Sequence, residues 1–385
     1  MILLLTFALL QIVRNKTRLL VALAGIGFAV ILIFLQLGFM NALYEAAMAP
    51  HKSIKADLVL LNTQSKVLFA LESFPRERIY QAQRVKGVKS VASLYVGLGQ
   101  WKNPDNHTKR SLLVYAFDPA QSVFKFPEIV NNLNDLKMAN RILFDKLSRR
   151  EFGAIAKNFN QGYQVSTELE GVRVEVAGLF SLGASFAADG NVITSDSTFL
   201  HIFKGRSIKK INVGLITLEP NANPQAVIKT LTKILPNDVK AMTLEDFALS
   251  EKHYWETSAA IGFIFGLGVI MGFMVGAIIV YQILYADVSD HLAEYATLKA
   301  MGYPHSFLLN VVFQESLILA VLGYIPGFLI SELMYDLTRR DTNLPVFMTP
   351  SLALFVLVLT IAMCFLAGTI AMRKLQSADP ADICF

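Results

Sequence analysis

Side chains capable of catalysis occur in this 385-residue chain, but not in catalytic arrangements. No two histidines have the H-x-x-x-H or H-E-x-x-H spacing that places two metal ligands on one helix face. The run GASFA at residues 183–187 lacks the final glycine of a G-x-S-x-G nucleophile elbow, and no G-x-x-x-x-G-K-[ST] phosphate loop occurs. The sequence predicts a non-catalytic chain without a metal or cofactor of its own. Any ATP and Mg²⁺ would be bound by a separate chain.

One carboxylate, Glu315, lies inside a long apolar segment. A lone charge in hydrocarbon is costly, so this side chain should face protein, water or lipid headgroups. It could relay protons, or it could be a structural residue that is hydrogen-bonded to a neighbouring helix. Because the other apolar segments offer no second ionisable partner, we expect the structural role.

Three glycines, Gly268, Gly272 and Gly276, recur every four residues in another apolar segment. This spacing places them on one face of a helix, where small residues allow two membrane helices to approach closely. Glycine is also simply common in membrane helices. We nevertheless expect a helix–helix contact here, either within one chain or across a dimer.

These residues belong to apolar blocks that are long enough to cross a membrane. The chain is 54% hydrophobic with a mean hydropathy of +0.47, and a membrane helix needs about 20 apolar residues. The predicted spans are residues 20–40, 258–285, 306–334 and 351–372. The first apolar run of the chain is too short to cross, so residues 1–19 are predicted to form an amphipathic helix in the cytoplasmic membrane interface.

Basic residues close to the spans predict the orientation of the chain. Three of them lie at positions 14–18, before the first span, and Arg373 and Lys374 follow the fourth. An even number of spans puts both ends on one side, so both are predicted to be cytoplasmic, including the tail 373–385. Basic residues in the short loop predicted at 335–350, and just after the first span, weaken this rule without reversing it.

Residues 41–257, between the first two spans, are the only part of the chain that looks soluble. Runs rich in β-forming residues, several with period-two alternation, predict strands, and two segments have helical patterns. The predicted strands are residues 55–62, 111–117, 172–180 and 211–219, and the predicted helices are residues 75–85 and 223–236. Residues 121–161 are rich in Asn and Lys and are predicted to be surface helices or loops. The segment is therefore predicted to be an extracytoplasmic α+β domain.

A polar, helix-forming stretch at residues 286–305 separates the second and third spans. Asp287 can cap a helix N-terminus, Lys299 suits the negative end of the helix dipole, and Gly302 followed by proline is a helix stop. One apolar stripe is formed by Val288, Leu292, Tyr295, Leu298 and Met301. We expect a cytoplasmic helix whose stripe either lies on the membrane surface or docks in a groove of a soluble partner.

The stretch EYATLKAMGY resembles the E-I-G-x-L-[RK]-A-[LM]-G signature of MacB/FtsX-type permeases, the membrane subunits of mechanotransmitting ABC transporters. The matching positions are Glu294, Leu298, Lys299, Ala300, Met301 and Gly302. The departures are Tyr295 and Ala296 in place of Ile-Gly, and His291 where Arg is common. QESLILAVLGYIPG resembles the third span of this family through Glu315, Gly323 and Gly327. The stretch VSDHLAEYATLKAMGY looks most like the DevC proteins of cyanobacteria, the permeases of DevBCA-type exporters.

The resemblance implies an integral membrane protein with four transmembrane α-helices and a large extracytoplasmic α+β domain between spans 1 and 2. It also implies a homodimer in which each coupling helix, residues 286–305, seats in a separate ABC ATPase subunit. The ATPase-coupling residues implied are Glu294, Tyr295, Leu298, Lys299, Met301 and Gly302. The helix-packing residues are Gly268, Gly272, Gly276, Glu315, Gly323 and Gly327.

Further partners follow from the same resemblance. A periplasmic membrane-fusion adaptor and a TolC-like outer-membrane protein would complete an exporter for a lipid, glycolipid or other amphipathic substrate. The resemblance also implies that the chain works in the lipid membrane, as part of a bacterial inner membrane, and no nucleic acid is expected as a partner. The alternative is an FtsX-like signal transducer that transports nothing and controls an extracytoplasmic partner such as a cell-wall hydrolase.

Overall fold

The computed structural model describes residues 16–185, 188–257, 260–290, 301 and 305–376. The chain divides into two compact units. The membrane bundle contains the chain up to Ala42, Ile261–Asp341 and the chain from Val346 onward, and the inter-span domain contains Leu43–Ala260 and Thr342–Pro345.

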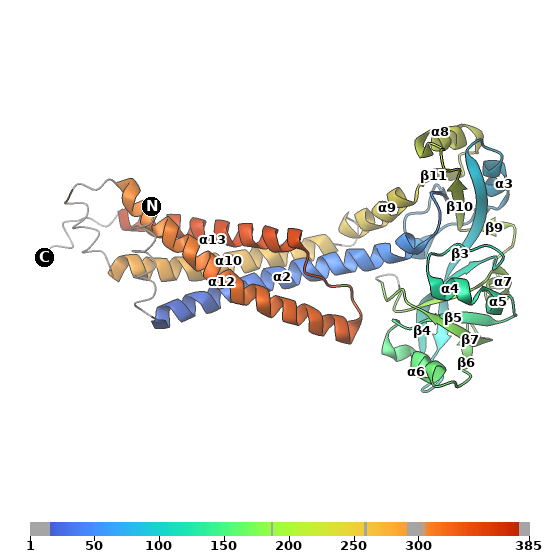
Figure 1. The fold of residues 1–385 in the computed structure, drawn as a ribbon, viewed down its shortest axis with the longest axis horizontal. Helices are drawn as coiled ribbons and strands as arrows, with labels where there is room; N and C mark the ends of the chain where they lie inside the picture. Colours follow the sequence, from blue (N-terminus) through green and yellow to red (C-terminus); the bar gives the residue numbers. More distant parts are fainter. Residues whose placement is uncertain (1–15, 186–187, 258–259, 291–300, 302–304, 377–385) are drawn as a thin grey trace. The chain divides into compact units, whose positions relative to one another are not determined.

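Four long helices make up most of the membrane bundle and lie alongside one another (Figure 1). They are α2 (Lys16–Ser53), α10 (Ile261–Asp290), α12 (His305–Thr342) and α13 (Pro350–Gln376). Each contains a stretch that is long and apolar enough to cross a membrane. With an α+β domain inserted between α2 and α10, the chain has the predicted fold class of a multi-pass membrane protein.

Helices α2 and α10 both continue past the C-terminal ends of the predicted spans. Helix α2 continues beyond residue 40 to Ser53, because the sequence NALYEAAMA consists largely of good helix formers. Helix α10 continues to Asp290, since neither glycine nor proline interrupts YQILYADVSD. Residues 286–290 therefore form the last turn of α10, and Asp287 lies inside this helix rather than capping a separate one.

Helix α12 also extends further than predicted. It reaches Thr342, so the first half of the loop predicted at residues 335–350 is helical. Asp336 lies 3.0 Å from Arg339 and 2.5 Å from Arg340, at the i,i+3 and i,i+4 spacings that support a helix. The connection to α13 is consequently confined to residues 343–349.

The inter-span domain is organised by a nine-stranded mixed sheet of order β11-β1-β10-β3-β4-β8-β5-β7-β6. Its strands are β1 (Leu58–Asn62), β3 (Val88–Lys102), β4 (Lys109–Phe117), β5 (Arg141–Asp145), β6 (Ser166–Leu169), β7 (Val172–Phe180), β8 (Asn191–Ser195), β10 (Val213–Leu218) and β11 (Val239–Thr243). The strands β2 (Phe74–Pro75) and β9 (Lys210–Ile211) form a separate pair. The helices are α3 (Glu77–Gln83), α4 (Pro127–Asn131), α5 (Leu133–Leu136), α6 (Ile155–Asn160), α7 (Asp196–Ile202), α8 (Pro224–Ile234) and α9 (Leu244–Thr257), with 3₁₀ turns η1 (Leu68–Ala70) and η2 (Arg150–Phe152).

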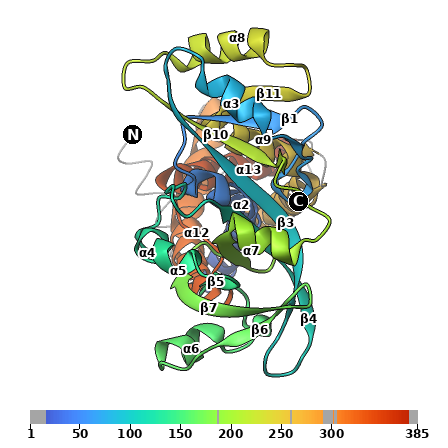
Figure 2. The same ribbon diagram turned by 90° about the vertical axis from the view of Figure 1, so that its right-hand side faces the viewer.

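The long strand β3 joins the two halves of this sheet (Figure 2). Its first half, from Val88 to Leu94, pairs with β10, and its second half, from Leu94 to Lys102, pairs with β4. Its last two residues also pair with β6. A single 15-residue strand thus places the β3–β4 hairpin and β6 at the opposite end of the sheet from α3 and α8.

Both faces of the sheet are buried. Alternate residues of β1 belong to different hydrophobic clusters, with Leu58 and Leu60 in one and Val59 and Leu61 in the other. Strands buried on two sides read as continuous apolar runs instead of alternating ones. The indole of Trp101, fully buried, donates to the Phe152 carbonyl at 3.1 Å and so fixes the far end of β3 in the core.

Candidate functional site

The glycines of α10 lie against α2 at successive turns. The facing pairs are Gly276 with Ala29, Gly272 with Ile33, and Gly268 with Gln36. A Cβ atom at Gly276 would come within 2.7 Å of the Ala29 Cβ, closer than two packed carbon atoms approach. It would also meet Met363 of α13. The stripe therefore makes contacts within one chain, where hydrogen in place of a side chain lets the helices approach.

Two glycines of α12 also lie against α2. A Cβ atom at Gly323 would be 2.6 Å from Ile26 Cγ2, and one at Gly327 would be 2.7 Å from Val30 Cγ1. Helix α2 is thus in close contact with both α10 and α12. Two glycines of α2 itself make further close contacts, Gly25 with Ile279 of α10 and Gly38 with the Tyr335 ring of α12. Neither of these two contacts was predicted from the sequence, because only the glycines of later spans were considered.

An ionic cluster joins the same three helices at the last turn of α10. Arg18 of α2 places Nη1 3.6 Å from Asp287 Oδ1 and donates from Nη2 to Asp290 Oδ2 at 2.7 Å. Asp287 also lies beside the Glu315 carboxyl group of α12. Asp287 and Glu315 are only 7% and 3% exposed. Two buried acids therefore meet at the point where Arg18 approaches α10.

The expectation that Glu315 has no ionisable partner is wrong, because Asp287 lies beside it. The sequence pattern places Asp287 in the polar stretch between spans, away from Glu315. The extension of α10 to Asp290 brings Asp287 into the helix that packs against α12. Arg18 had been used only as an indicator of orientation, and no signal in the sequence connected it with Asp287.

Of the six residues expected to couple to an ATPase, only Met301 is among the described residues. It lies in a turn, and its side chain is 63% exposed. The other five are Glu294, Tyr295, Leu298, Lys299 and Gly302, which lie outside the described residues. An exposed, flexible thioether side chain suits contact with a partner, and the coupling role of all six stays a prediction.

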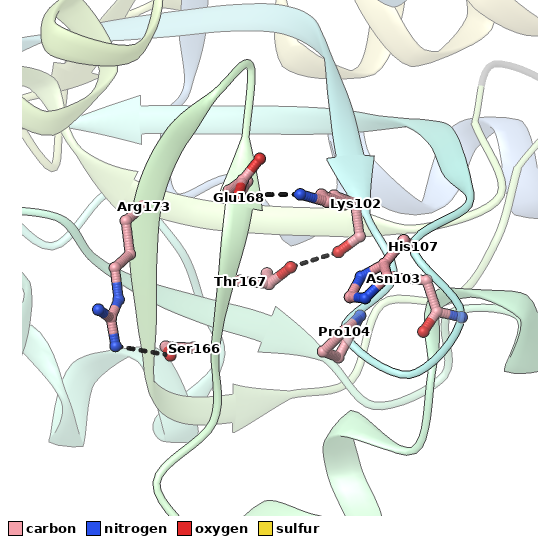
Figure 3. A pocket seen from close by; sticks show the side chains of 8 residues that line it. All are labelled: Lys102, Asn103, Pro104, His107, Ser166, Thr167, Glu168 and Arg173. Atoms are coloured by element: carbon pink, nitrogen blue, oxygen red, sulfur yellow. Dashed lines mark hydrogen bonds and ion pairs between the residues drawn. The ribbon is translucent and has the colours of Figure 1, made fainter.

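A polar pocket of about 300 Å³ lies where the β3–β4 hairpin meets β6 and β7 (Figure 3). Its charged groups are engaged with neighbours: Lys102 Nζ lies 2.9 Å from Glu168 Oε1, and Arg173 donates to Ser166 Oγ at 3.3 Å. The hydrogen bond and charge of Lys102 lower the pKa of the Glu168 carboxyl group. The pocket therefore suits hydrogen-bonded contact with a polar partner surface. Within the described ranges, no three His, Cys, Asp or Glu side chains converge as they would around a metal ion.

A buried carboxylate, Glu251 of α9, connects α9 with the start of the domain. Its Oε2 accepts from the Leu68 backbone N–H at 2.8 Å, and its Oε1 accepts from the Trp255 indole at 3.0 Å. The residue is 2% exposed, and this burial raises the pKa of Glu251 above the ordinary value of 4.5, although both hydrogen bonds act to lower it. Ionisation of Glu251 is thus disfavoured in the folded protein relative to the unfolded chain.

We expect the stability of the Glu251→Gln variant to improve relative to the native protein as pH rises. Because the folded pKa is raised, the folded state binds more protons than the unfolded state above about pH 4.5, so native stability falls as pH increases through the folded pKa. Glutamine does not ionise, so the stability of the variant lacks this fall with pH. Its altered hydrogen bonds change the stability by the same amount at every pH. Thermal unfolding of the full chain in detergent at about pH 5 and about pH 8 measures the difference. Glu256→Gln, exposed on the same helix, is the control, and identical pH dependence in all three proteins would contradict the expectation.

The fold and these contacts define a multi-pass membrane protein in which α10 and α12 pack against the first long helix, α2, and α13 packs against α10. Residues 266–380 match the family of FtsX-like permease C-terminal domains. The C-terminal part of the chain is therefore similar to an FtsX-like permease domain. Comparison with curated proteins gives no match.

Two solved structures are similar to part of the chain. The periplasmic region of MacB from Actinobacillus actinomycetemcomitans is 12% identical, with a TM-score of 0.37, and the match covers 51% of this chain and 92% of that one. The extracellular domain of the noncanonic ABC-type transporter YknZ from Gram-positive bacteria is 13% identical, with a TM-score of 0.33, and the match covers 49% of this chain and 98% of that one.

Proposed function

We propose that this chain is the membrane permease subunit of a mechanotransmitting ABC exporter for an amphipathic substrate, a lipid or glycolipid among the candidates. The match of residues 266–380 to FtsX-like permease C-terminal domains carries the proposal. Both ends of the chain would be cytoplasmic and the inter-span domain periplasmic, in a bacterial inner membrane. ATP and Mg²⁺ would be bound by a separate ATPase, and this chain would contribute no catalytic group.

The contacts of the bundle suggest how motion would pass through it. A push from an ATPase on the segment after Asp290 would enter α10 at the turn where Arg18 and Glu315 tie it to α2 and α12. Close glycine contacts leave little free space between α10 and α2, so displacement of one helix would displace the other. Helix α2 is continuous as far as Ser53, with Pro50 in its last turn, so the motion would pass along one helix into the inter-span domain.

The remaining partners belong to the same proposal. Two permease copies would form a homodimer, and a membrane-fusion adaptor and a TolC-like outer-membrane protein would complete the export path, as in a DevBCA-type system. The polar pocket around Lys102 and Glu168 supports an adaptor contact, because its paired charges and hydroxyl groups can exchange hydrogen bonds with another protein surface.

Replacing both Leu298 and Met301 with Asp should abolish recovery of the ATPase subunit while leaving membrane insertion intact. Burying one such side chain is worth roughly 1.5–3 kcal/mol, and the change also introduces two charges into the partner's groove. Affinity purification of the tagged permease from its native host, with the co-purified ATPase quantified, measures the effect. Ile234→Asp, at an exposed apolar residue of α8, is the control. Undiminished recovery in the double variant would contradict the coupling proposal.

The alternative, an FtsX-like transducer that transports nothing, would need the same helices and the same ATPase. The family match fits it equally well, because FtsX names that family. The size of the inter-span domain, Leu43–Ala260, favours export, since it offers enough surface for an adaptor. A native complex that hydrolyses ATP and activates a cell-wall hydrolase, yet moves no amphiphile across the envelope, would favour the transducer.

A further inference from the structure

A second pocket of the inter-span domain lies between the end of α2 and the start of α9 and has a volume of about 340 Å³. Its apolar lining comes from Met48 of α2 and from Leu244, Ala248 and Leu249 of α9. Leu249 is half exposed although its neighbours along the pocket are more covered. Ligand pockets range over roughly 300–1,000 Å³, so this one has room for a single acyl chain segment instead of a pair.

A buried histidine forms part of the lining. His51 is fully buried, and its polar contacts, with the Ala47 backbone and with Glu251, fall outside normal hydrogen-bond geometry. Its Nε2 is 3.6 Å from Glu251 Oε2, which is beyond hydrogen-bond distance, and its ring packs edge-on against Phe247. Buried polar atoms are nearly always satisfied, whereas the imidazole of this pocket wall is poorly satisfied by its neighbours.

The charges of the pocket favour an anion. Lys125 is exposed, donates to the Lys52 carbonyl at 3.0 Å, and forms no ion pair with any described acid. Lys52 is 2.5 Å from Glu45, and Glu245 is the one acid in the lining. The ammonium group of Lys125 is therefore available for a headgroup at the rim, beside apolar surface that can cover a chain.

The part of the pocket lining that α2 supplies follows the predicted first span in the sequence. Met48 follows Met40, the last residue of the predicted first span, on the same continuous helix, at a rise of about 12 Å. We propose that this pocket binds a single-chain amphiphile with an anionic headgroup, taken from the outer face of the membrane. The chain lies against Met48, Ala248 and Leu249, and the headgroup reaches Lys125. The proposal rests on the proposed export function, in which such a molecule would be the substrate.

Photolabelling of the full chain tests this site. The protein is placed in nanodiscs of zwitterionic phospholipid with a photoreactive long-chain fatty acid, and cross-linked peptides are mapped by mass spectrometry. We expect labels on the peptides that contain Met48 and Leu249. Leu249→Glu should reduce this labelling roughly fivefold or more, because it places a charge on the apolar wall and repels the carboxylate. Ile234→Glu, an equally exposed residue of α8, should leave it unchanged.

A second variant tests the contact of the headgroup separately from the contacts of the acyl chain. Lys125→Ala should weaken labelling by the fatty acid and leave labelling by the fatty alcohol of equal length unaffected. Equal labelling of native protein and Leu249→Glu, or labels confined to α10, α12 and α13, would overturn the proposal. Cross-links from this pocket to a second copy or to another protein would also overturn it. The labelling assay needs no ATPase, so the two proposals can fail separately. If the native protein is not labelled at the pocket but recovers its ATPase normally, only the pocket proposal is rejected. If the pocket is labelled but no ATPase is recovered, only the exporter proposal is rejected.

Discussion

Gly276→Leu should unfold at a markedly lower temperature than the native protein, whereas Gly266→Leu on the same helix should stay close to native. A side chain at Gly276 would collide with Ala29 and Met363, which come from two different helices. Overpacking of a well-packed core costs typically 1–3 kcal/mol, and leucine adds far more than one methylene. At Gly266 nothing lies within 4 Å of an added Cβ, so the same substitution meets open space.

The measurement is thermal stability of the full chain in detergent, followed by loss of monodisperse protein on size-exclusion chromatography. Gly276→Ala should fall between the two leucine variants, because the end of the Met363 side chain can move aside while Ala29 cannot. If both leucine variants lose stability equally, the Gly276 contact with α2 would have no special weight. Co-purification of the ATPase with Gly276→Ala would show whether the α2–α10 contact matters for coupling as well as for folding.

Arg18→Met should destabilise the bundle by about 2 kcal/mol, whereas Glu315→Gln should be nearly neutral. Removing one partner of a buried ion pair costs about 3–5 kcal/mol, and the figure is smaller here because Arg18 is partly exposed. Glutamine is uncharged and can donate to Asp287, so the substitution removes one of two acids that face each other and keeps the volume of the side chain. Combining Arg18→Met with Asp287→Asn should recover part of the loss, since no unpaired acid then faces the methionine.

The same thermal assay measures these variants, with Arg340→Met as the control for loss of an exposed arginine near the end of another bundle helix. A Glu315→Gln variant as unstable as Arg18→Met would mean that Glu315 is ionised and belongs to the ion pair. Full additivity in the double variant would mean that Arg18 and Asp287 do not interact. Either result would contradict the contacts of Arg18, Asp287 and Glu315 on which this prediction rests.

Local patterns in the sequence were enough for the main architecture. The four apolar blocks predict four long helices because crossing hydrocarbon requires a continuous apolar run, which is a property of the run alone. In the inter-span domain, the predicted strand at residues 172–180 has the bounds of β7, and the helix predicted at 223–236 contains α8. The segment 121–161, predicted as surface helices or loops, does hold α4, α5 and α6 but also the buried strand β5. The apolar run ILF of β5 is short, and only pairing with β7 and β8 makes it a strand.

Tertiary structure decided which residues meet. Spacing places Gly268, Gly272 and Gly276 on one face of a helix, but which helix lies opposite depends on how α10 and α2 pack. The pairing of Asp287 with Glu315 was hidden for a different reason. Whether Asp287 ends a span or starts a new helix depends on α10 continuing to Asp290, and its closeness to Arg18 depends on residues more than two hundred positions apart. Sequence patterns report the periodicity of one element, whereas the energies that set these contacts arise between elements that fold together.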